Sequence, residues 1–308
     1  MVMKKVFWII LCMFFTPPVT FAGNMKLHYD RPAEYFEEAL VIGNGTMGAT
    51  LYGGVKKDKI SFNDITLWTG EPESENSSPD AFNTIPEIRA LLDNEDYQGA
   101  DKAQYKVQGH YSENYQPLGT LTIEYLDDTA GISDYHRWLD IGNATARTQY
   151  LKDGKLFTSD YFASAPDSVI VIRLKSENKE GIHALLSFDS PLPHSSQVAD
   201  NEISVEGYAA YHSFPVYYKA EDKHRYDPER GIHFKTLVRV LSVDGRVKNR
   251  YLDSRIEIDG STEVLILIAN VTSFNGFDKD PVKEGRNYRS HVEKRMKCAV
   301  GKTYDALR

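Results

Sequence analysis

The chain has 308 residues with 36 Lys and Arg against 44 Asp and Glu, which gives a formal net charge of −8. This acidic balance argues against a nucleic-acid partner, because nucleic-acid phosphates are bound by clusters of Lys and Arg. The two cysteines, Cys12 and Cys298, offer little for a disulfide framework. A chain of this length buries roughly three quarters of its unfolded surface, so its stability is expected to come from a hydrophobic core.

Residues 1–22 have the pattern of an export signal peptide. The charged pair Lys4-Lys5 precedes an apolar run at 6–15, and Thr-Phe-Ala at 20–22 provides a cleavage site. A run of about ten apolar residues is too short to span a bilayer, which needs roughly 20, so no membrane anchor is predicted. We therefore expect an exported protein, periplasmic or extracellular, whose mature form has lost two lysine charges and carries a net charge of −10.

Two short helices are predicted to interrupt the strands. The first spans Ile85–Leu92, and Pro86 is well placed near its start, where the first helical N–H has no partner to lose. The second spans Asp96–Val107. The preceding stretch, 70–84, is rich in Glu, Ser, Asn and Pro and is predicted to be an exposed loop. The pair therefore forms a short helical insertion.

Short strands account for most of the remaining chain. Asp-Gly pairs at 153–154, 244–245 and 259–260 are the turn signals expected between hairpin strands. Two runs, Val169–Ile172 and Val264–Ile268, are continuously apolar, which is typical of strands covered on both faces. Strands are predicted at 118–126, 144–151, 156–163, 168–174, 184–188, 234–241 and 264–269. The series predicts a mainly β fold, a large β-sandwich (super-sandwich).

The C-terminal segment changes to a helical pattern. Apolar residues recur there at spacings of three to five, at Tyr288, Val292, Met296, Ala299, Tyr304 and Leu307. A helix of this kind needs something to cover its apolar face. Two covers are possible: its own sandwich, or a further domain into which the helix leads. The pattern continues without a C-cap glycine, which favours the further domain.

No metal, nucleotide or cofactor site is predicted. The histidines include no His-x-His and no pair four residues apart, and no paired cysteines are present, so a zinc site is not indicated. The glycine-rich stretch 42–48 resembles a phosphate loop. However, a strand-like segment follows it, where a phosphate loop would be followed by a long helix.

Aromatic residues are abundant, with 19 Tyr, 14 Phe and three Trp. Their flat faces could stack on the apolar patches of a sugar ring, although most are expected to lie in the core. Trp68 and Tyr115 are the best candidates for a ligand contact, because the Gly and Pro beside them indicate exposed turns. Trp138, which lies in a strand pattern, is expected to be buried.

Seven short motifs occur in a recognisable order after the openings at 29–34 and 40–45. They are 53–55, 60–63, 66–70, 115–119, 161–167, 189–194 and 272–277. In order and spacing they make the chain, from Tyr29 to its end, similar to the N-terminal domain of glycoside hydrolase family 95, the α-L-fucosidase family.

The resemblance implies a specific domain organisation. Residues 23–277 would form the family's N-terminal β-sandwich, and 278–308 would begin a helical linker to a catalytic (α/α)₆ barrel that is absent from this chain. Enzymes of the family hydrolyse terminal α-L-fucosyl linkages, and some prefer α-L-galactosides, with inversion. Their general acid is a Glu, and their water is activated by Asn residues supported by an Asp, all within the barrel.

No catalytic residue can be assigned here, because the family's catalytic motifs have no counterpart in this sequence. We therefore expect a domain that is inactive alone and meets fucosylated glycans through the parent enzyme, with its own barrel as partner. Asn63, Trp68 and Tyr115 are predicted to form a wall of the substrate pocket. The alternative is a stand-alone carbohydrate-binding β-sandwich without turnover.

A third reading is catalysis by carboxylates of this segment itself, which requires two acidic groups converging on one glycosidic bond. The densest acidic cluster contains Asp30, Glu34, Glu37 and Glu38, but solvated charges that pair with the neighbouring arginine explain it more simply. Asp64 follows a predicted strand, where capping of the backbone is the simpler role.

Overall fold

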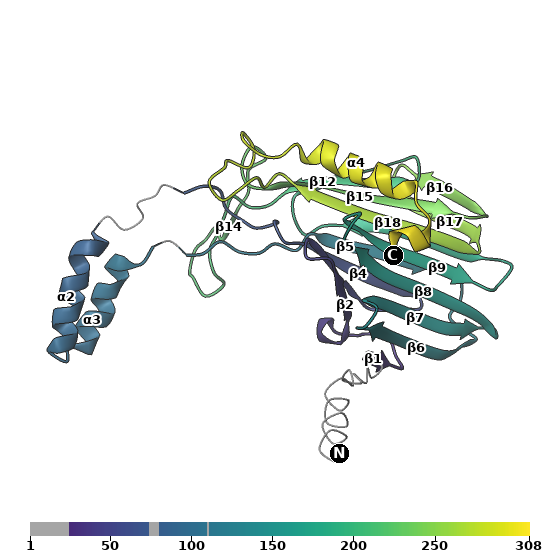
Figure 1. Cartoon of the computed structure of the whole chain (residues 1–308), viewed down its shortest axis with the longest axis horizontal. Coiled ribbons are helices and arrows are strands. Elements are labelled where there is room, and N and C mark those ends of the chain that lie inside the picture. Colours follow the sequence, from purple (N-terminus) through teal and green to yellow (C-terminus); the bar gives the residue numbers. More distant parts are fainter. Residues whose placement is uncertain (1–24, 74–79, 110) are drawn as a thin grey trace, which may run out of the picture.

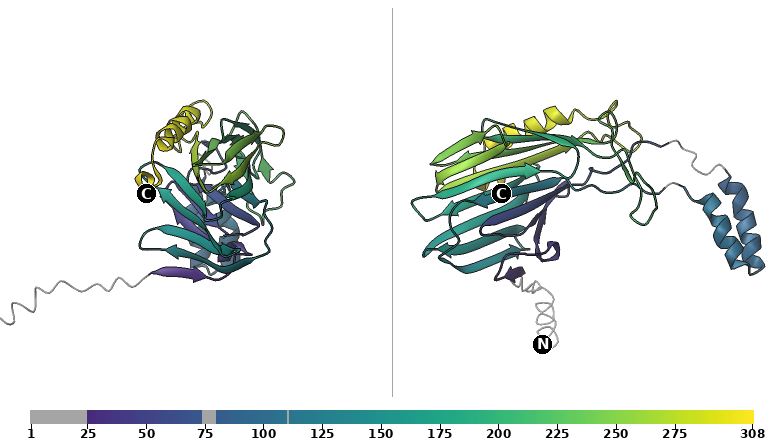
Figure 2. Two further views of the ribbon diagram at one scale, coloured as in Figure 1. Left: turned by 90° about the vertical axis from the view of Figure 1, so that its right-hand side faces the viewer. Right: turned by 180° about the vertical axis from the view of Figure 1, so that it is seen from behind.

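The computed structural model describes residues 25–73, 80–109 and 111–308, so the signal peptide predicted at 1–22 lies outside the described residues. The described chain is a β-sandwich built from a nine-stranded sheet, here called sheet A, and a seven-stranded sheet, called sheet B (Figures 1 and 2). Every pairing within these sheets is antiparallel. The predicted mainly β sandwich is therefore confirmed.

The strands of sheet A do not follow chain order across the sheet. Its spatial order is β1 (Lys26–Tyr29), β6 (Ile132–Asp140), β7 (Thr145–Lys152), β8 (Lys155–Ser164), β9 (Val169–Ser176), β18 (Glu263–Thr272), β15 (His233–Ser242), β12 (Glu202–Tyr208) and β11 (His194–Ala199).

Sheet B and the smaller elements complete the structure. The order in sheet B is β16 (Arg246–Arg250), β17 (Arg255–Ser261), β10 (Ile182–Asp189), β5 (Gly119–Tyr125), β4 (Lys57–Asp64), β3 (Met47–Leu51) and β2 (Leu40–Gly43). The other elements are β13 (His212–Ser213), β14 (His224–Arg225), η1 (Phe36–Glu38), α2 (Ala81–Asp93), α3 (Tyr97–Gln104), η2 (Tyr105–Val107), α4 (Tyr288–Val300) and α5 (Tyr304–Leu307).

The continuously apolar strands serve two layers at once. In β9, Ile170 and Ile172 face the core between the sheets, whereas Val169 and Val171 pack in a second cluster on the outer face of sheet A. This second cluster is completed by α4, which lies across that face (Figure 1). The expectation that such strands are covered on both faces is confirmed. Successive apolar residues of a strand point to opposite faces of the sheet, so each face is covered by a different layer.

The C-terminal helix is covered by its own sandwich. Val292, Met296 and Ala299 are at most 2% exposed and pack on sheet A. The expectation of a continuous stripe without a C-cap glycine is wrong, since α4 ends at Val300 and Gly301 follows as its C-cap. Gly301 separates α4 from α5, so two short helices share the stripe that the sequence pattern presents as one.

The three Asp-Gly pairs have different roles. Asp153 and Gly154 have φ of 51° and 75° and form the two-residue turn of the β7–β8 hairpin, as predicted. The pair at 244–245 instead connects β15 of sheet A to β16 of sheet B. The pair at 259–260 lies inside β17, opposite a register shift in β10. The glycine has positive φ in all three pairs, but only one of these pairs closes a hairpin.

The helical insertion is a hairpin that stands clear of the sandwich (Figures 1 and 2). Its first helix begins at Ala81, four residues before the predicted start, so Pro86 lies inside the helix and not at its first turn. Ala100 and Ala103 of α3 are buried. Small residues such as these let two helices approach closely.

Strand β6 reverses one burial prediction. Trp138 is half-buried, with the guanidinium of Arg147 5.8 Å from its ring centroid, whereas neighbouring Arg137 is 1% exposed. The Arg137 side chain donates to the carbonyl oxygens of Arg31 (2.7 Å) and Glu38 (2.8 Å). The pairing of β6 with β7 is irregular between residues 133 and 136, where β6 has one residue more than β7. An extra residue in a strand reverses which of the following side chains point into the core and which point outward.

Candidate carbohydrate-binding site

A cavity of about 320 Å³ opens at one end of the sandwich, where chain segments leave the ends of β4 and β18. We call it the Trp68 cavity. It is lined by Ile65, Thr66, Trp68, Thr69, Gly70, Glu71, Pro72, Glu113, Ile232, Phe274, Gly276, Phe277, Lys279 and Pro281. Its volume is close to the lower limit of about 300 Å³ for small-molecule pockets, so it suits one sugar unit better than a long ligand.

Trp68 is held in place by the turn that follows β4. Its indole N–H donates to the carbonyl oxygen of Ile65 at 3.0 Å, and its ring meets Tyr115 edge-on, with centroids 5.8 Å apart. The side chain remains 44% exposed. A large ring that is fixed at its polar end and open on a face is a suitable stacking surface for a sugar.

Asp64 anchors this turn to the far sheet. One carboxylate oxygen accepts the backbone N–H (2.9 Å) and the hydroxyl (2.7 Å) of Thr66, and the other accepts the side-chain amide of Asn270 in β18 (2.7 Å). Arg295 of α4 in turn donates to the carbonyl oxygen of Asn270 at 2.9 Å. Asp64 therefore has the capping role that its position predicts, and the floor of the cavity is tied to α4.

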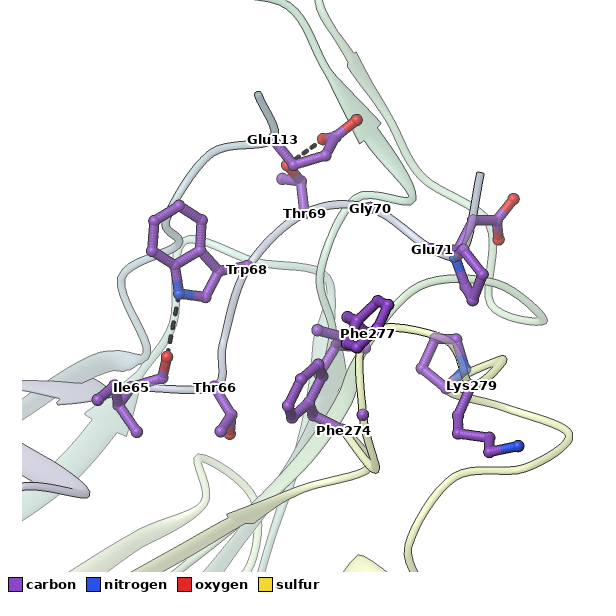
Figure 3. A pocket seen from close by; sticks show the side chains of 14 residues that line it. Ile65, Thr66, Trp68, Thr69, Gly70, Glu71, Glu113, Phe274, Phe277 and Lys279 are labelled. Carbon is purple, nitrogen blue, oxygen red and sulfur yellow. Dashed lines mark hydrogen bonds between the residues drawn. The ribbon is translucent and has the colours of Figure 1, made fainter. Parts of the chain in front are cut away.

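The opposite wall is formed by two phenylalanines after β18. Phe274 and Phe277 lie across the cavity from Trp68, with Lys279 beyond them (Figure 3). Phe277 is 89% exposed, so its ring is open to a ligand or partner. Neither residue was predicted as a site residue from the sequence. The signal that could have found them is a pair of aromatic residues three positions apart that flank Gly276 in the motif 272–277.

The polar side of the cavity centres on Glu113. Its carboxylate accepts from the Thr69 hydroxyl, from the backbone N–H of Ser213 (3.1 Å) and from a ring nitrogen of His212 (2.7 Å). Gly70 has φ of +105°, and a Cβ there would lie 2.6 Å from Cγ of Glu113. The glycine is thus required both by its backbone conformation and by the close approach of this carboxylate.

The three predicted wall residues differ in their relation to the cavity. Trp68 lines it, and Tyr115 supports Trp68 from outside the lining. Burial raises the pKa of Tyr115 to about 12, and the charge of Asp64 adds to the effect, so its hydroxyl stays protonated. Asn63 is exposed on β4, opposite Gly48 of β3, and is not among the lining residues.

The acidic cluster near the N-terminus is a surface network. Arg31 pairs with Glu34 (3.4 Å) and with Glu38, whose pKa is lowered chiefly by the backbone N–H that Glu34 donates to it. Neither Glu34 nor Glu38 lines the Trp68 cavity. These contacts agree with solvated, paired charges and give no convergent carboxyl pair.

Within 25–73, 80–109 and 111–308, no group of three His, Cys, Asp or Glu side chains is placed to hold a metal ion. Cys298 is an exposed free thiol. None of the helices described there is long and apolar enough to cross a membrane.

Comparison with known proteins identifies the family. Residues 27–276 match the family described as glycosyl hydrolase family 65, N-terminal domain. The chain belongs to this family. A solved structure titled putative kojibiose phosphorylase from human microbiome has the same fold, with a TM-score of 0.51 and 10% identity over 92% of this chain and 36% of that one.

The curated relatives agree with the fucosidase resemblance of the sequence motifs. "Alpha-L-fucosidase 2" of Arabidopsis thaliana is 29% identical over 88% of this chain and 34% of its own length. "Probable alpha-fucosidase A" of Aspergillus niger is 26% identical over 94% of this chain and 36% of its own length. The chain thus spans about a third of the length of these relatives and is a glycoside hydrolase-like domain.

Proposed function

We propose that this chain is the N-terminal, non-catalytic domain of an exported glycoside hydrolase that releases terminal α-L-fucosyl, or α-L-galactosyl, residues with inversion. A catalytic (α/α)₆ barrel would perform the chemistry. It would correspond to the part of the relatives that this chain does not match. The sandwich would present the Trp68 cavity as one wall of the substrate pocket.

The observation that carries this proposal is the agreement between family membership and two relatives with α-fucosidase names over most of the chain. The chemistry of the cavity supports a binding role. Glu113 is occupied by three donors, and Glu71 is paired with the guanidinium of Arg230. Glycoside hydrolysis needs a carboxylic acid that gives up a proton and a second carboxyl group that acts on the opposite side, and neither glutamate is free for such a role.

The first test is the gene sequence beyond the codon for Arg308, followed by expression of both the longer product and this chain. With 4-nitrophenyl α-L-fucopyranoside as substrate, the longer product should release nitrophenol and this chain should not. Turnover by this chain alone would overturn its non-catalytic role. A longer product that leaves both the α-L-fucoside and the α-L-galactoside intact would overturn the proposed substrate.

The role of the cavity is tested in the longer product by Trp68→Ala. Loss of one stacked ring should cost about 1 kcal/mol, so kcat/KM should fall about fivefold. Lys279→Ala, in the same lining but without a ring, controls for general disturbance of the cavity. If Trp68→Ala stays within about twofold of the parent enzyme, the wall role is wrong.

One observation favours a second candidate, a carbohydrate-binding sandwich without turnover. The outer face of α4 is polar, with Arg289, Glu293, Lys294 and Lys297 exposed, while the apolar face is already covered by sheet A. The apolar face of α4 is therefore covered without a further domain. This candidate predicts measurable glycan affinity of the chain and no turnover by any longer product.

A further inference from the structure

A second hollow, of about 660 Å³, lies beside the Trp68 cavity. Glu71 and Pro72 line both, so the two hollows are neighbours along this short segment. The arm that carries β13 and β14 forms another wall, at the end of the sandwich from which the chain runs toward α2 (Figure 1). We call this hollow the aromatic cleft, and its main lining residues are Tyr111, His212, Phe214, Tyr218, Arg225 and Arg230.

Three aromatic rings form one side of the aromatic cleft. Phe214 and Tyr218 stack nearly parallel, with centroids 4.7 Å apart and 14° between the ring planes, and Tyr111 meets Tyr218 at 5.4 Å. Tyr111 is 45% exposed and Tyr218 is 39% exposed. Stacking on one another orders the rings, and their remaining faces are open to a ligand.

The polar side chains of the cleft are ordered by partners behind them. His212 bonds Glu113 through Nδ1 at 2.7 Å, which leaves Nε2 as its second polar atom. Arg230 pairs with Glu71, and its guanidinium lies 3.6 Å from the ring centroid of Tyr211. Side chains held in this way lose little conformational entropy when a ligand binds, so the site is pre-organised.

The charge balance selects the class of ligand. The lining carries two carboxylates, Glu71 and Glu73, and two guanidinium groups, Arg225 and Arg230, so its formal charges balance. Arg230 is paired with Glu71, and His212 is paired with Glu113 behind the lining. A phosphate or nucleotide would favour a lining with an excess of cations, which this one does not have. Flat aromatic faces together with fixed donors and acceptors of low net charge match a neutral sugar, which offers apolar C–H patches and several hydroxyl groups.

We propose that the aromatic cleft binds the inner, neutral pyranose units of an oligosaccharide whose terminal sugar occupies the Trp68 cavity. The shared Glu71–Pro72 segment makes the two hollows successive subsites for one extended ligand. This inference rests on the proposed function in assuming a glycan ligand, and it adds a preference for oligosaccharides over single sugars.

The test is calorimetric titration of the purified protein with three probes: L-fucose, 2′-fucosyllactose and maltotriose. Tyr218→Ala should weaken binding of 2′-fucosyllactose about fivefold or more and leave L-fucose binding unchanged, because one stacking ring is lost only from the cleft. Tyr218→Phe keeps the ring stack and should bind like the parent protein. Tyr251→Ala removes a tyrosine that is 72% exposed, in the turn between β16 and β17 and away from the cleft, and should have no effect.

The outcomes separate this inference from the proposed function. If 2′-fucosyllactose binds and Tyr218→Ala, folded by circular dichroism, binds it equally well, the cleft is not a subsite. If maltotriose binds in a Tyr218-dependent manner and L-fucose does not bind, the cleft is supported as a site for neutral sugars, but its link to a terminal fucosyl unit in the Trp68 cavity is wrong. If none of the three sugars binds, the cleft inference is overturned, while hydrolysis by the longer product still decides the proposed function.

Discussion

The two helical additions to this sandwich differ in what covers their apolar faces. In α4, Val292 and Met296 are 0% and 2% exposed, because they pack on the outer face of sheet A. In α2, Phe82, Ile85 and Leu92 share one helical face by their spacing, yet they are 84%, 41% and 46% exposed. Both helices have an amphipathic pattern, but only α4 is packed against a sheet.

The difference shows that an apolar stripe on a helix is buried only where another element presents an apolar surface to it. The face of sheet A under α4 presents Val171, Leu267 and Ala269, which belong to strands whose outward residues are also apolar. Apolar surface on both sides is removed from water together, at about 25 cal/mol per Å². Among the described residues, α2 packs in a hairpin with α3 that stands clear of the strands, so no sheet covers its outer face (Figures 1 and 2).

The largest effect that tests this comparison is expected from Met296→Ala. It removes a 2% exposed side chain from the interface between α4 and sheet A, so the free energy of unfolding should fall by about 2–5 kcal/mol. Urea denaturation followed by circular dichroism measures the change. Lys297→Ala, at the next, exposed position, should stay within about 0.5 kcal/mol. Equal stabilities of the two variants would show that α4 does not pack on the sandwich in solution.

An intermediate effect is expected from a buried carboxyl group inside the sandwich. Burial raises the pKa of Asp58 from 3.8 to about 6, although Gly54 N–H (2.9 Å) and the Tyr161 hydroxyl (2.7 Å) donate to it. Because the folded pKa is above the unfolded one, the folded state binds the proton more tightly. Asp58 should therefore add stability as the pH falls from about 6 to about 4, on the order of 3 kcal/mol at about 1.4 kcal/mol per pKa unit.

The measurement is urea unfolding of the parent protein and of Asp58→Asn across this pH range. Carboxylates with lowered pKa, such as the half-buried Glu38, lose their contribution on acidification in both proteins, so the difference between the two curves isolates Asp58. As the pH falls, the free energy of unfolding of the parent protein should rise relative to that of the variant. Parallel curves would show that Asp58 is solvated.

The smallest effect is expected from Phe82→Ala, the counterpart of Met296→Ala in the hairpin. Because Phe82 is 84% exposed, its removal should change the free energy of unfolding by no more than about 0.5 kcal/mol. The same urea titration detects the change. A loss above about 2 kcal/mol would mean that the outer face of α2 is buried in solution, against another copy or another part of the parent protein.

Family and fold could be predicted from the sequence because their signals are local or cover the whole chain. Alternating and continuous apolar runs identify strands one at a time, as at Val169–Ile172, and the turn at Asp153-Gly154 follows from the positive φ of both residues. The resemblance to an α-L-fucosidase-type N-terminal domain depends on motifs that run through nearly the whole chain from Tyr29 onward. For the candidate site, the sequence pointed to Trp68, because an aromatic residue beside glycine indicates an exposed turn.

The tertiary structure decided what those signals leave open. It places Arg137, not Trp138, on the inner side of β6, because an irregularity in strand register depends on the neighbouring strand. It also brings Phe274 and Phe277 across from Trp68, about two hundred residues earlier in the chain. Their meeting depends on β4 and β18 ending at the same edge of two packed sheets, and the Asp64–Asn270 hydrogen bond of 2.7 Å joins those ends. Strand patterns are read within single segments, whereas a site between two sheets exists only once the sheets have packed.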